Sequence, residues 1–414
     1  MARFLPYTSP VALTLLLVAL FAIPVTAAEL PSTVSKGATL VEVFSSAAFH
    51  EGPTWDPATG KLYFTAFFGG EKPNQQIIRL DAPGKGTVWL DKSEGVNGTW
   101  LSLDGRLLGA QAYGHRLISY SFGPKGPADA KTLAINTKWH QPNDVCQAPN
   151  GNIYFTDPDF ANQKTSKVYL LKSDGKATVI IDDTPVPNGL ITSNDGKVLY
   201  VGDSHRKMWR SYPILANGTT GPGKDFFDPG TKNMSAPDGM TIDAKGNLYF
   251  TGRGGVWVAS PAGKPVGFIP TKEFCANVTF GGADGKTLYL TCNTKVYSLA
   301  MNVSGGEHAA RAGRKGKKKG LTGLLRRTLK PAGRVLKGVG KAIDKIGDDD
   351  ACARNTITIL PGSTNDDTDD ADRPFCAAGV AGRRCRNIDR GREKRREEEG
   401  EEAGRIQGDL PGAG

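Results

Sequence analysis

Hydrophobic and polar positions along the chain repeat in one pattern, in which a polar turn containing glycine precedes an alternating apolar strand. Each strand ends at threonine or a small residue, as in the segments LYFTA, IYFTD and LYFTG. The pattern occurs six times, and its turn glycines are 45, 46, 45, 50 and 39 residues apart. The copies are 56–66, 101–112, 147–157, 192–203, 242–252 and 282–292, with Gly60, Gly105, Gly151, Gly196, Gly246 and Gly285 in their turns.

This repeat predicts β-structure throughout. Asn-Gly and Asp-Gly pairs supply the positive φ values of tight turns, and aromatic and β-branched runs suit a half-buried pleated surface. A unit of about 45 residues with four short strands has the size of one propeller blade. We therefore predict an all-β, six-bladed β-propeller over residues 29–304, with 38–44 (ATLVEVF) pairing with the last blade to close the ring. An irregular β-sandwich is the alternative.

The N-terminal segment 1–28 is typical of an export signal. Arg3 is followed by an apolar run from Val11 to Val25, and Val25-Thr26-Ala27 forms a small-residue cleavage site. The apolar run is short for a transmembrane anchor, which needs about 20 residues. This interpretation predicts a secreted or periplasmic protein.

The C-terminal segment 305–414 differs in composition from the rest of the chain. It holds 24 of the 52 Lys and Arg residues and 18 of the 42 Asp and Glu residues, so the remainder carries only +4 of the net charge of +10. Low-complexity charged runs of this kind are typical of disorder. For the cationic stretch 321–346, contact with an anionic membrane surface is the alternative to disorder, and the body shows no platform for nucleic acid.

The cysteines leave the disulfide pattern open. Cys275 and Cys292 flank one predicted hairpin and could pair if the chain is exported. Cys146 has no evident partner in the body, and Cys352, Cys376 and Cys385 lie in the tail. Five N-x-S/T sequons are further candidates for modification in a eukaryotic secretory route, at Asn97, Asn217, Asn233, Asn277 and Asn302.

Four oxygen-bearing residues precede turn glycines by about eight residues, each beside Pro or Gly: Glu51, Asn143, Asn188 and Asp238. In a propeller the innermost strands line a central channel, so equivalent positions in four blades would direct these side chains at a common axis. Two carboxylates and two amide carbonyls suit Ca²⁺, with Mg²⁺, Mn²⁺ or Zn²⁺ as other candidates. Taken singly, each residue is equally typical of an ordinary turn.

The motifs around these residues resemble those of the senescence marker protein / gluconolactonase / luciferin-regenerating enzyme family. The chain carries EGPTW from Glu51, PNDV around Asn143, PNG around Asn188 and PDGM around Asp238. The resemblance spans about residues 38–303 and implies a six-bladed propeller with a divalent cation held by Glu51, Asn188 and Asp238. It further implies that Asn143 contacts the metal or the substrate and that Asp238 is the general base.

The activity that the resemblance implies is metal-assisted hydrolysis of a small lactone. A cation would polarise the lactone carbonyl, and Asp238 would take a proton from the attacking water. Asp238 acting only as a ligand is an alternative. Two other functions stay open, namely a hydrolase that uses the same metal face on other esters or organophosphates, and a propeller that binds a ligand without catalysis.

The predicted substrate contacts are Asn143, Gln141 and His115. Some sugar lactonases of the family have arginine where this chain has Gln141, so the preference for a sugar ring is an open question. His115 matches a family position where a channel histidine often occurs. Further residues considered for this face are His140, His205 and Arg253.

Overall fold

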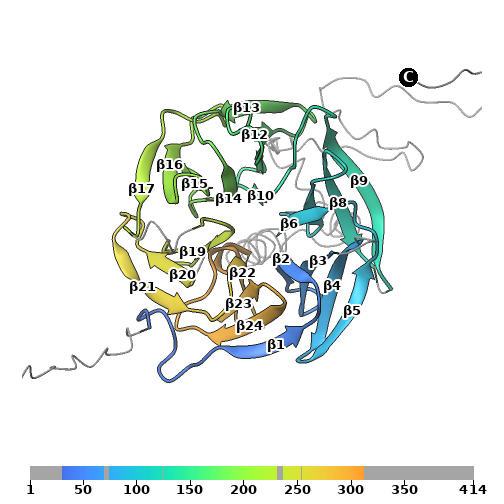
Figure 1. Ribbon diagram of the computed structural model, residues 1–414, viewed down its shortest axis with the longest axis vertical. Helices are drawn as coiled ribbons and strands as arrows, with labels where there is room; N and C mark the ends of the chain where they lie inside the picture. Colours follow the sequence, from blue (N-terminus) through green and yellow to red (C-terminus); the bar gives the residue numbers. More distant parts are fainter. Residues whose placement is uncertain (1–29, 70–73, 124, 231–235, 253, 312–414) are drawn as a thin grey trace, which may run out of the picture. The chain divides into compact units, whose positions relative to one another are not determined.

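Six four-stranded antiparallel sheets surround a central axis and form a six-bladed β-propeller, as predicted (Figure 1). The computed structural model describes residues 30–69, 74–123, 125–230, 236–252 and 254–311. The predicted signal peptide, Arg253 and residues 312–414 of the predicted tail lie outside the described residues, so the predictions made for them stay predictions. No helix in the described part of the chain is long and apolar enough to cross a membrane.

Each blade runs from an innermost strand at the axis to an outermost strand at the rim. The first three blades are β2 (Phe49–Asp56), β3 (Lys61–Phe68), β4 (Asn74–Ala82), β5 (Lys85–Leu90); β6 (Val96–Leu101), β7 (Leu107–Gln111), β8 (Arg116–Phe122), β9 (Pro127–Ile135); and β10 (Val145–Gln147), β11 (Ile153–Asp157), β12 (Lys167–Leu171), β13 (Ala177–Ile181). The next two are β14 (Pro187–Thr192), β15 (Val198–Asp203), β16 (Met208–Pro213), β17 (Lys224–Phe227); and β18 (Met240–Ile242), β19 (Leu248–Gly252), β20 (Gly255–Ala259), β21 (Pro265–Pro270).

The sixth blade is built from both ends of the propeller. It combines β22 (Cys275–Gly281), β23 (Thr287–Cys292) and β24 (Lys295–Ala300) with β1 (Val41–Ser45), which pairs antiparallel with β24. This confirms the predicted closure, because an N-terminal strand completes the blade that the C-terminal strands begin. Cys275 and Cys292 lie directly opposite each other in β22 and β23 and are buried as free thiols.

The repeated LYFT segment packs on both of its faces. In β11, Tyr154 contacts the following blade around Leu190 and Leu199, whereas Phe155 contacts the preceding blade around Leu108. In β19, Tyr249 likewise packs against the last blade, and Phe250 packs against the preceding blade, β14–β16. Because successive side chains of a strand point to opposite faces, this second strand of the blade is buried on both sides and reads as a nearly continuous apolar run.

The threonine that ends this run connects it to the innermost strands. Thr65, Thr251 and Thr291 are fully buried. Thr65 Oγ1 donates to the carbonyl of Asn97 in the next blade at 3.0 Å, and Thr251 Oγ1 lies 2.7 Å from Gly239 O and 2.6 Å from Ala276 O. These bonds fix the backbone around the axis, where the candidate site lies.

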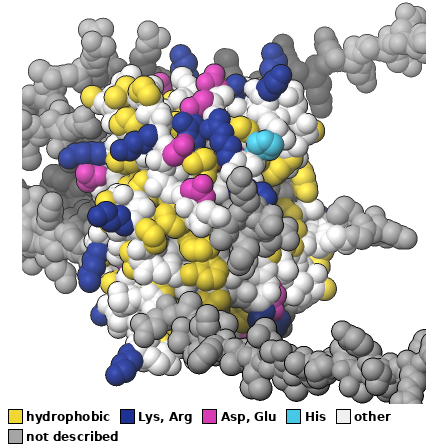
Figure 2. All heavy atoms as spheres, turned by 60° about the vertical axis from the view of Figure 1, so that its left-hand side comes forward, with side chains coloured by type: hydrophobic (Ala, Val, Ile, Leu, Met, Phe, Trp, Pro, Cys, Tyr) yellow, Lys and Arg dark blue, Asp and Glu magenta, His cyan; other side chains and the backbone are white. Residues whose placement is uncertain are grey.

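The outer strands are more polar. Most residues of β9 and of β5 are exposed. Figure 2 faces the side of the ring that carries β17 and β21, and there Lys and Arg side chains are mixed with Asp and Glu around hydrophobic patches. Charged side chains at the outer edges discourage pairing with a further strand.

Candidate functional site

Six residues occupy matching places where the innermost strands begin, each opposite the end of the second strand of its blade. These axial residues are Glu51, Asn97, Asn143, Asn188, Asp238 and Asn277. They are 46, 46, 45, 50 and 39 residues apart, so they follow nearly the same period as the turn glycines. In four blades the strand register breaks beside the axial residue.

Three of the four predicted cation ligands are in contact. The carboxyl groups of Glu51 and Asp238 are neighbours, and the hydrogen bond between them lowers the pKa of Glu51 and raises that of Asp238, whereas the Asn188 side chain lowers the pKa of Asp238. Gly52 N donates to Glu51 Oε2 at 2.5 Å. Asn143 is buried in the matching place of its blade, but among the described residues no hydrogen bond joins its side chain to the other three.

Asn277 connects this group to a third carboxyl. Its Nδ2 donates to Glu51 Oε2 at 2.9 Å and lies 3.3 and 3.4 Å from the two carboxyl oxygens of Asp144. Its own Oδ1 accepts from Val278 N at 2.8 Å. Asn277 therefore holds two acidic side chains from different blades close together.

Burial disfavours the ionisation of all three acids, and neighbouring charge adds to this effect at Asp144 and Asp238. Removal from bulk water raises the pKa of Asp238 well above its usual range, and the charges of Glu51 and Asp144 raise it further. Burial also raises the pKa of Glu51, against the hydrogen bonds from Gly52 and Asn277. For Asp144, burial and then the Glu51 charge raise the pKa. Gathered carboxyls of this kind are stabilised as anions when a cation lies among them.

The donor set fits an oxygen-coordinated cation. Asn188 Oδ1 and Asn97 Oδ1 are buried and have no hydrogen-bond partner among the described residues. A buried carbonyl oxygen without a donor is costly, and a hard cation would satisfy it. No three His, Cys, Asp or Glu side chains in the described ranges could hold a metal ion by themselves, so amide oxygens would have to complete the shell beside Glu51 and Asp238.

Glycine directly follows four of the axial residues, and a Cβ at each of these glycines would clash with an adjacent blade. A Cβ on Gly52, whose φ is +44°, would lie 2.1 Å from Asn97 O, and one on Gly189 would lie 2.1 Å from Asp238 O. Contacts this short are forbidden, so only glycine lets the innermost strands of adjacent blades approach. This explains why the EGP and PNG motifs contain glycine.

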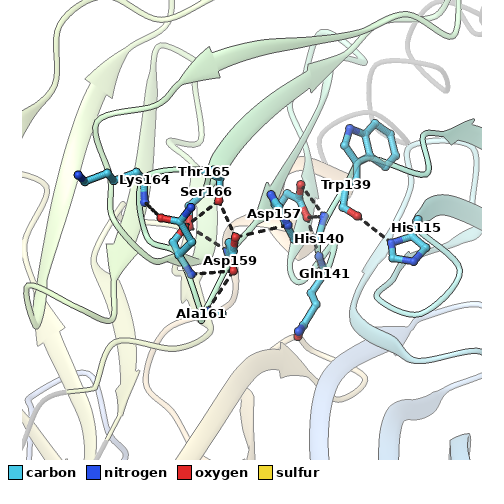
Figure 3. A network of polar contacts seen from close by, with 11 residues as sticks. His115, Trp139, His140, Gln141, Asp157, Asp159, Ala161, Lys164, Thr165 and Ser166 are labelled. Atoms are coloured by element: carbon cyan, nitrogen blue, oxygen red, sulfur yellow. Dashed lines mark hydrogen bonds and ion pairs between the residues drawn. The ribbon is translucent and has the colours of Figure 1, made fainter. Parts of the chain in front are cut away.

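Beside the axis, a polar network organises the loop between β9 and β10 (Figure 3). The Asp157 carboxyl accepts from His140 N at 2.9 and 3.1 Å and from Gln141 N at 2.7 Å. His140 Nδ1 lies 3.5 Å from Asp159 Oδ2. The Gln141 side chain is exposed and points away from this network in Figure 3.

The other histidines differ in position. His115 is half-buried with a φ of +49°, and its Nδ1 lies 2.8 Å from Trp139 O (Figure 3). It thus lies against the loop that carries Gln141, whereas His205 is exposed in the turn after β15. The structure brings His115, Gln141 and Asn143 to one blade-to-blade junction.

A helical turn at 306–311, within the segment predicted as tail, lies beside the ends of the innermost strands β6, β14 and β18. Arg311 Nη2 donates to Leu101 O at 2.6 Å and to Ser102 O at 3.0 Å, at the end of β6. A cavity of about 30 Å³ separates this turn from the axial residues, and its polar lining includes Asp144, Thr99, Asn277 and Glu307. It has room for a water molecule.

Sequence analysis missed Asn97, Asp144 and Asn277 as channel residues. The period pointed to them, since Asn97 lies midway between Glu51 and Asn143 and Asn277 falls 39 residues after Asp238. Both asparagines were singled out only as sequons. Asn277 is 6% exposed, so it belongs to the interior and not to a glycosylated surface.

Comparison with known proteins gives a family match over most of the propeller. A family model described as SMP-30/Gluconolactonase/LRE-like region matches residues 49–294, which is more than half of the 414 residues. That range includes all six axial residues.

Individual relatives share about a quarter of their residues with the chain. The gluconolactonase of Zymomonas mobilis is 26% identical over 304 residues, covering 64% of this chain and 83% of that protein. A pentonolactonase of Haloferax volcanii is 25% identical over 256 residues, covering 60% and 83%. The structure of a gluconolactonase from Xanthomonas campestris superposes with a TM-score of 0.55 at 24% identity, covering 67% of this chain and 99% of that one, which supports the shared fold.

Proposed function

Because the chain belongs to the SMP-30/gluconolactonase/LRE-like family, we propose that it is a divalent-cation-dependent hydrolase that opens a small lactone. The observation that carries the proposal is the axial cluster, in which Glu51 and Asp238 adjoin Asn188, whose Oδ1 has no partner among the described residues. Two relatives are named for the hydrolysis of sugar lactones, which supports a small hydroxylated lactone as the substrate class.

Glu51, Asn188 and Asp238 would hold the cation, with Asn143 as a further ligand or a substrate contact. Ca²⁺ is the first candidate, because the donors are carboxylate and amide oxygens and no cysteine or histidine is among them. When bound, the cation would polarise the ester carbonyl and stabilise negative charge on its oxygen.

The side chains would divide the remaining work. Asp238 accepts a proton from water as the water oxygen bonds to the carbonyl carbon, and it returns the proton to the ring oxygen as the ring C–O bond breaks. The product is a hydroxy acid. Gln141 and His115 lie on the loop side of the channel, where their hydrogen-bonding groups would orient hydroxyl groups of the substrate.

The test is a hydrolysis assay on the full-length chain with a panel of sugar and aliphatic lactones, followed by a pH indicator. We expect acid release that is lost on chelation with EDTA and restored by Ca²⁺. Hydrolysis that is unchanged by EDTA would contradict the cation-dependent mechanism. Hydrolysis of aryl esters or phosphotriesters without lactones would favour the alternative hydrolase, and cation binding without any hydrolysis would favour a ligand-binding propeller.

We also propose that the protein is exported, on the strength of the apolar run from Val11 to Val25 and the small residues that follow it. N-terminal sequencing of the secreted protein should then begin at Ala28 or Glu29. A mature protein that still begins at Met1 would contradict this.

A further inference from the structure

The Asn188 amide is held by hydrogen bonds on its nitrogen alone. Its Nδ2 donates to Ser204 Oγ at 3.3 Å, and the neighbouring Asn188 side chain lowers the pKa of the Asp238 carboxyl, as a hydrogen-bond donor does. Its Oδ1 is buried and lacks a partner among the described residues. The amide nitrogen is thus engaged, and the oxygen is left free.

Ser204 accepts from Asn188 but donates its own hydrogen bond elsewhere. Its single hydroxyl hydrogen is donated to the carbonyl oxygen of Pro237, so Ser204 Oγ can offer Asn188 only a lone pair. Ser204 follows the end of β15, whereas Pro237 directly precedes Asp238 in the next blade. One hydroxyl group therefore connects the segments that carry two of the proposed cation ligands.

This arrangement decides which atom of the amide is left free. If the Asn188 amide turned over, Oδ1 would face the lone pair of Ser204 Oγ and the acceptor oxygens of Asp238. Both contacts would become repulsive, and the Nδ2 hydrogens would point where Oδ1 now lies. An amide nitrogen cannot coordinate a hard cation, so the inverted amide would remove one ligand.

We propose that Ser204 is a positioning residue for cation binding, which it supports by keeping Asn188 Oδ1 free to coordinate and by joining Asn188 to the backbone before Asp238. The inference rests on the proposed cation site but concerns a residue that does not contact the cation. Outer partners that orient metal ligands typically change metal affinity by about 10- to 100-fold. We place Ser204→Ala at about ten-fold, since Asp238 still holds the Asn188 amide.

The experiment compares Ca²⁺ affinity in the full-length chain by titration calorimetry and by the Ca²⁺-dependent rise in unfolding temperature. Ser204→Ala should weaken the affinity, and Ser204→Thr should restore it because threonine keeps the hydroxyl group. Ser211→Ala is the matched control. Ser211 belongs to β16 of the same blade, is 3% exposed, and its Oγ has no partner among the described residues. It should bind Ca²⁺ like the unmodified chain.

The results distinguish failure of the proposed Ser204 role from failure of the proposed cation site. If the unmodified chain binds Ca²⁺ and Ser204→Ala binds it equally well, Ser204 has no positioning role, while the proposed function stands. If Ser204→Thr binds as weakly as Ser204→Ala, the hydroxyl group is not the cause. If the unmodified chain binds no divalent cation, the proposed cation site and this inference both fall. Turnover at saturating Ca²⁺ should change little in Ser204→Ala.

Discussion

A substitution of Asp238 can test its role in proton transfer without disturbing the packing of the channel. Asparagine has almost the same shape, but it cannot take a proton. We expect Asp238→Asn to lower kcat at saturating cation by at least about 100-fold, the usual contribution of a general base. The cation-free protein should unfold at the same or a higher temperature, because the pKa of Asp238 is raised by burial and by two neighbouring acids.

The measurements for Asp238→Asn are initial rates by pH-stat and a thermal melt without cation. Asp174→Asn is the control, since Asp174 lies in an exposed turn where its carboxyl only accepts from Lys176 N. Retained turnover at saturating cation would assign the base to another group. A large fall in the unfolding temperature would make Asp238 chiefly a structural residue.

At the same scale, the sequence predicted which residues meet but only part of how they meet. Glu51, Asn188 and Asp238 were identified by register and are in contact. Asp144 and Asn277 were missed because neither has the neighbouring Pro or Gly that the four predicted ligands share. Ser204 could not be found from sequence, since its role depends on a hydrogen bond to the next blade.

The loop between β9 and β10 is the element that presents Gln141 and Asn143, and Asp157 at the end of β11 holds it. We expect Asp157→Ala to leave the N–H groups of His140 and Gln141 without their carboxylate acceptor, at a cost of about 1–3 kcal/mol of unfolding free energy. Because the loop carries proposed substrate contacts, KM should rise more than kcat falls. Urea unfolding and steady-state kinetics on the preferred lactone measure the two effects.

Asp157→Asn is the matched variant for this loop. Asp157 Oδ1 alone accepts from both His140 N at 2.9 Å and Gln141 N at 2.7 Å. An asparagine oxygen in that place can accept both bonds, so Asp157→Asn should behave nearly like the unmodified chain. If both variants lose the same stability, the charge of Asp157 matters more than its acceptor geometry.

The strands and turns were the features of the structure that the sequence predicted most fully. The LYFT repeat is buried on both faces, which gives a strong apolar signal, and the glycine turns mark the hairpins. The outer strands were harder to place, because their exposure leaves little hydrophobic alternation; β9, for example, is mostly exposed. Side-chain burial, and not strand propensity, therefore decided which strands could be predicted from the sequence.

The whole ring was predictable because the N-terminal strand was expected to complete the last blade. The helical turn at 306–311 was not expected, since its composition continues into the charged tail. It contributes Arg311, which binds the end of β6, and Glu307, which lines the channel cavity together with Asp144. The channel therefore has acidic residues both in the axial cluster and at the helical turn, and we expect stability to depend on pH at the helical turn.

Glu307 makes that sensitivity testable. Although the Glu307 side chain is 38% exposed, loss of contact with water raises its pKa from the ordinary 4.5 to about 7, and Arg311 opposes the shift. Between these two values the unfolded chain loses the Glu307 proton while the folded chain retains it, so this residue's contribution to stability falls as pH rises from 4.5 to 7. Glu307→Gln keeps the neutral form at every pH and should remove that loss.

The comparison is between unfolding temperatures of the cation-free full-length chain and of Glu307→Gln across this pH range. We expect the two to be similar near the acid end and Glu307→Gln to become progressively more stable toward neutral pH. Glu94→Gln is the control, because Glu94 is exposed in the loop between β5 and β6 and pairs with Arg116. Parallel curves would mean that Glu307 ionises as freely as in water, in which case the helical turn does not shield Glu307 in solution.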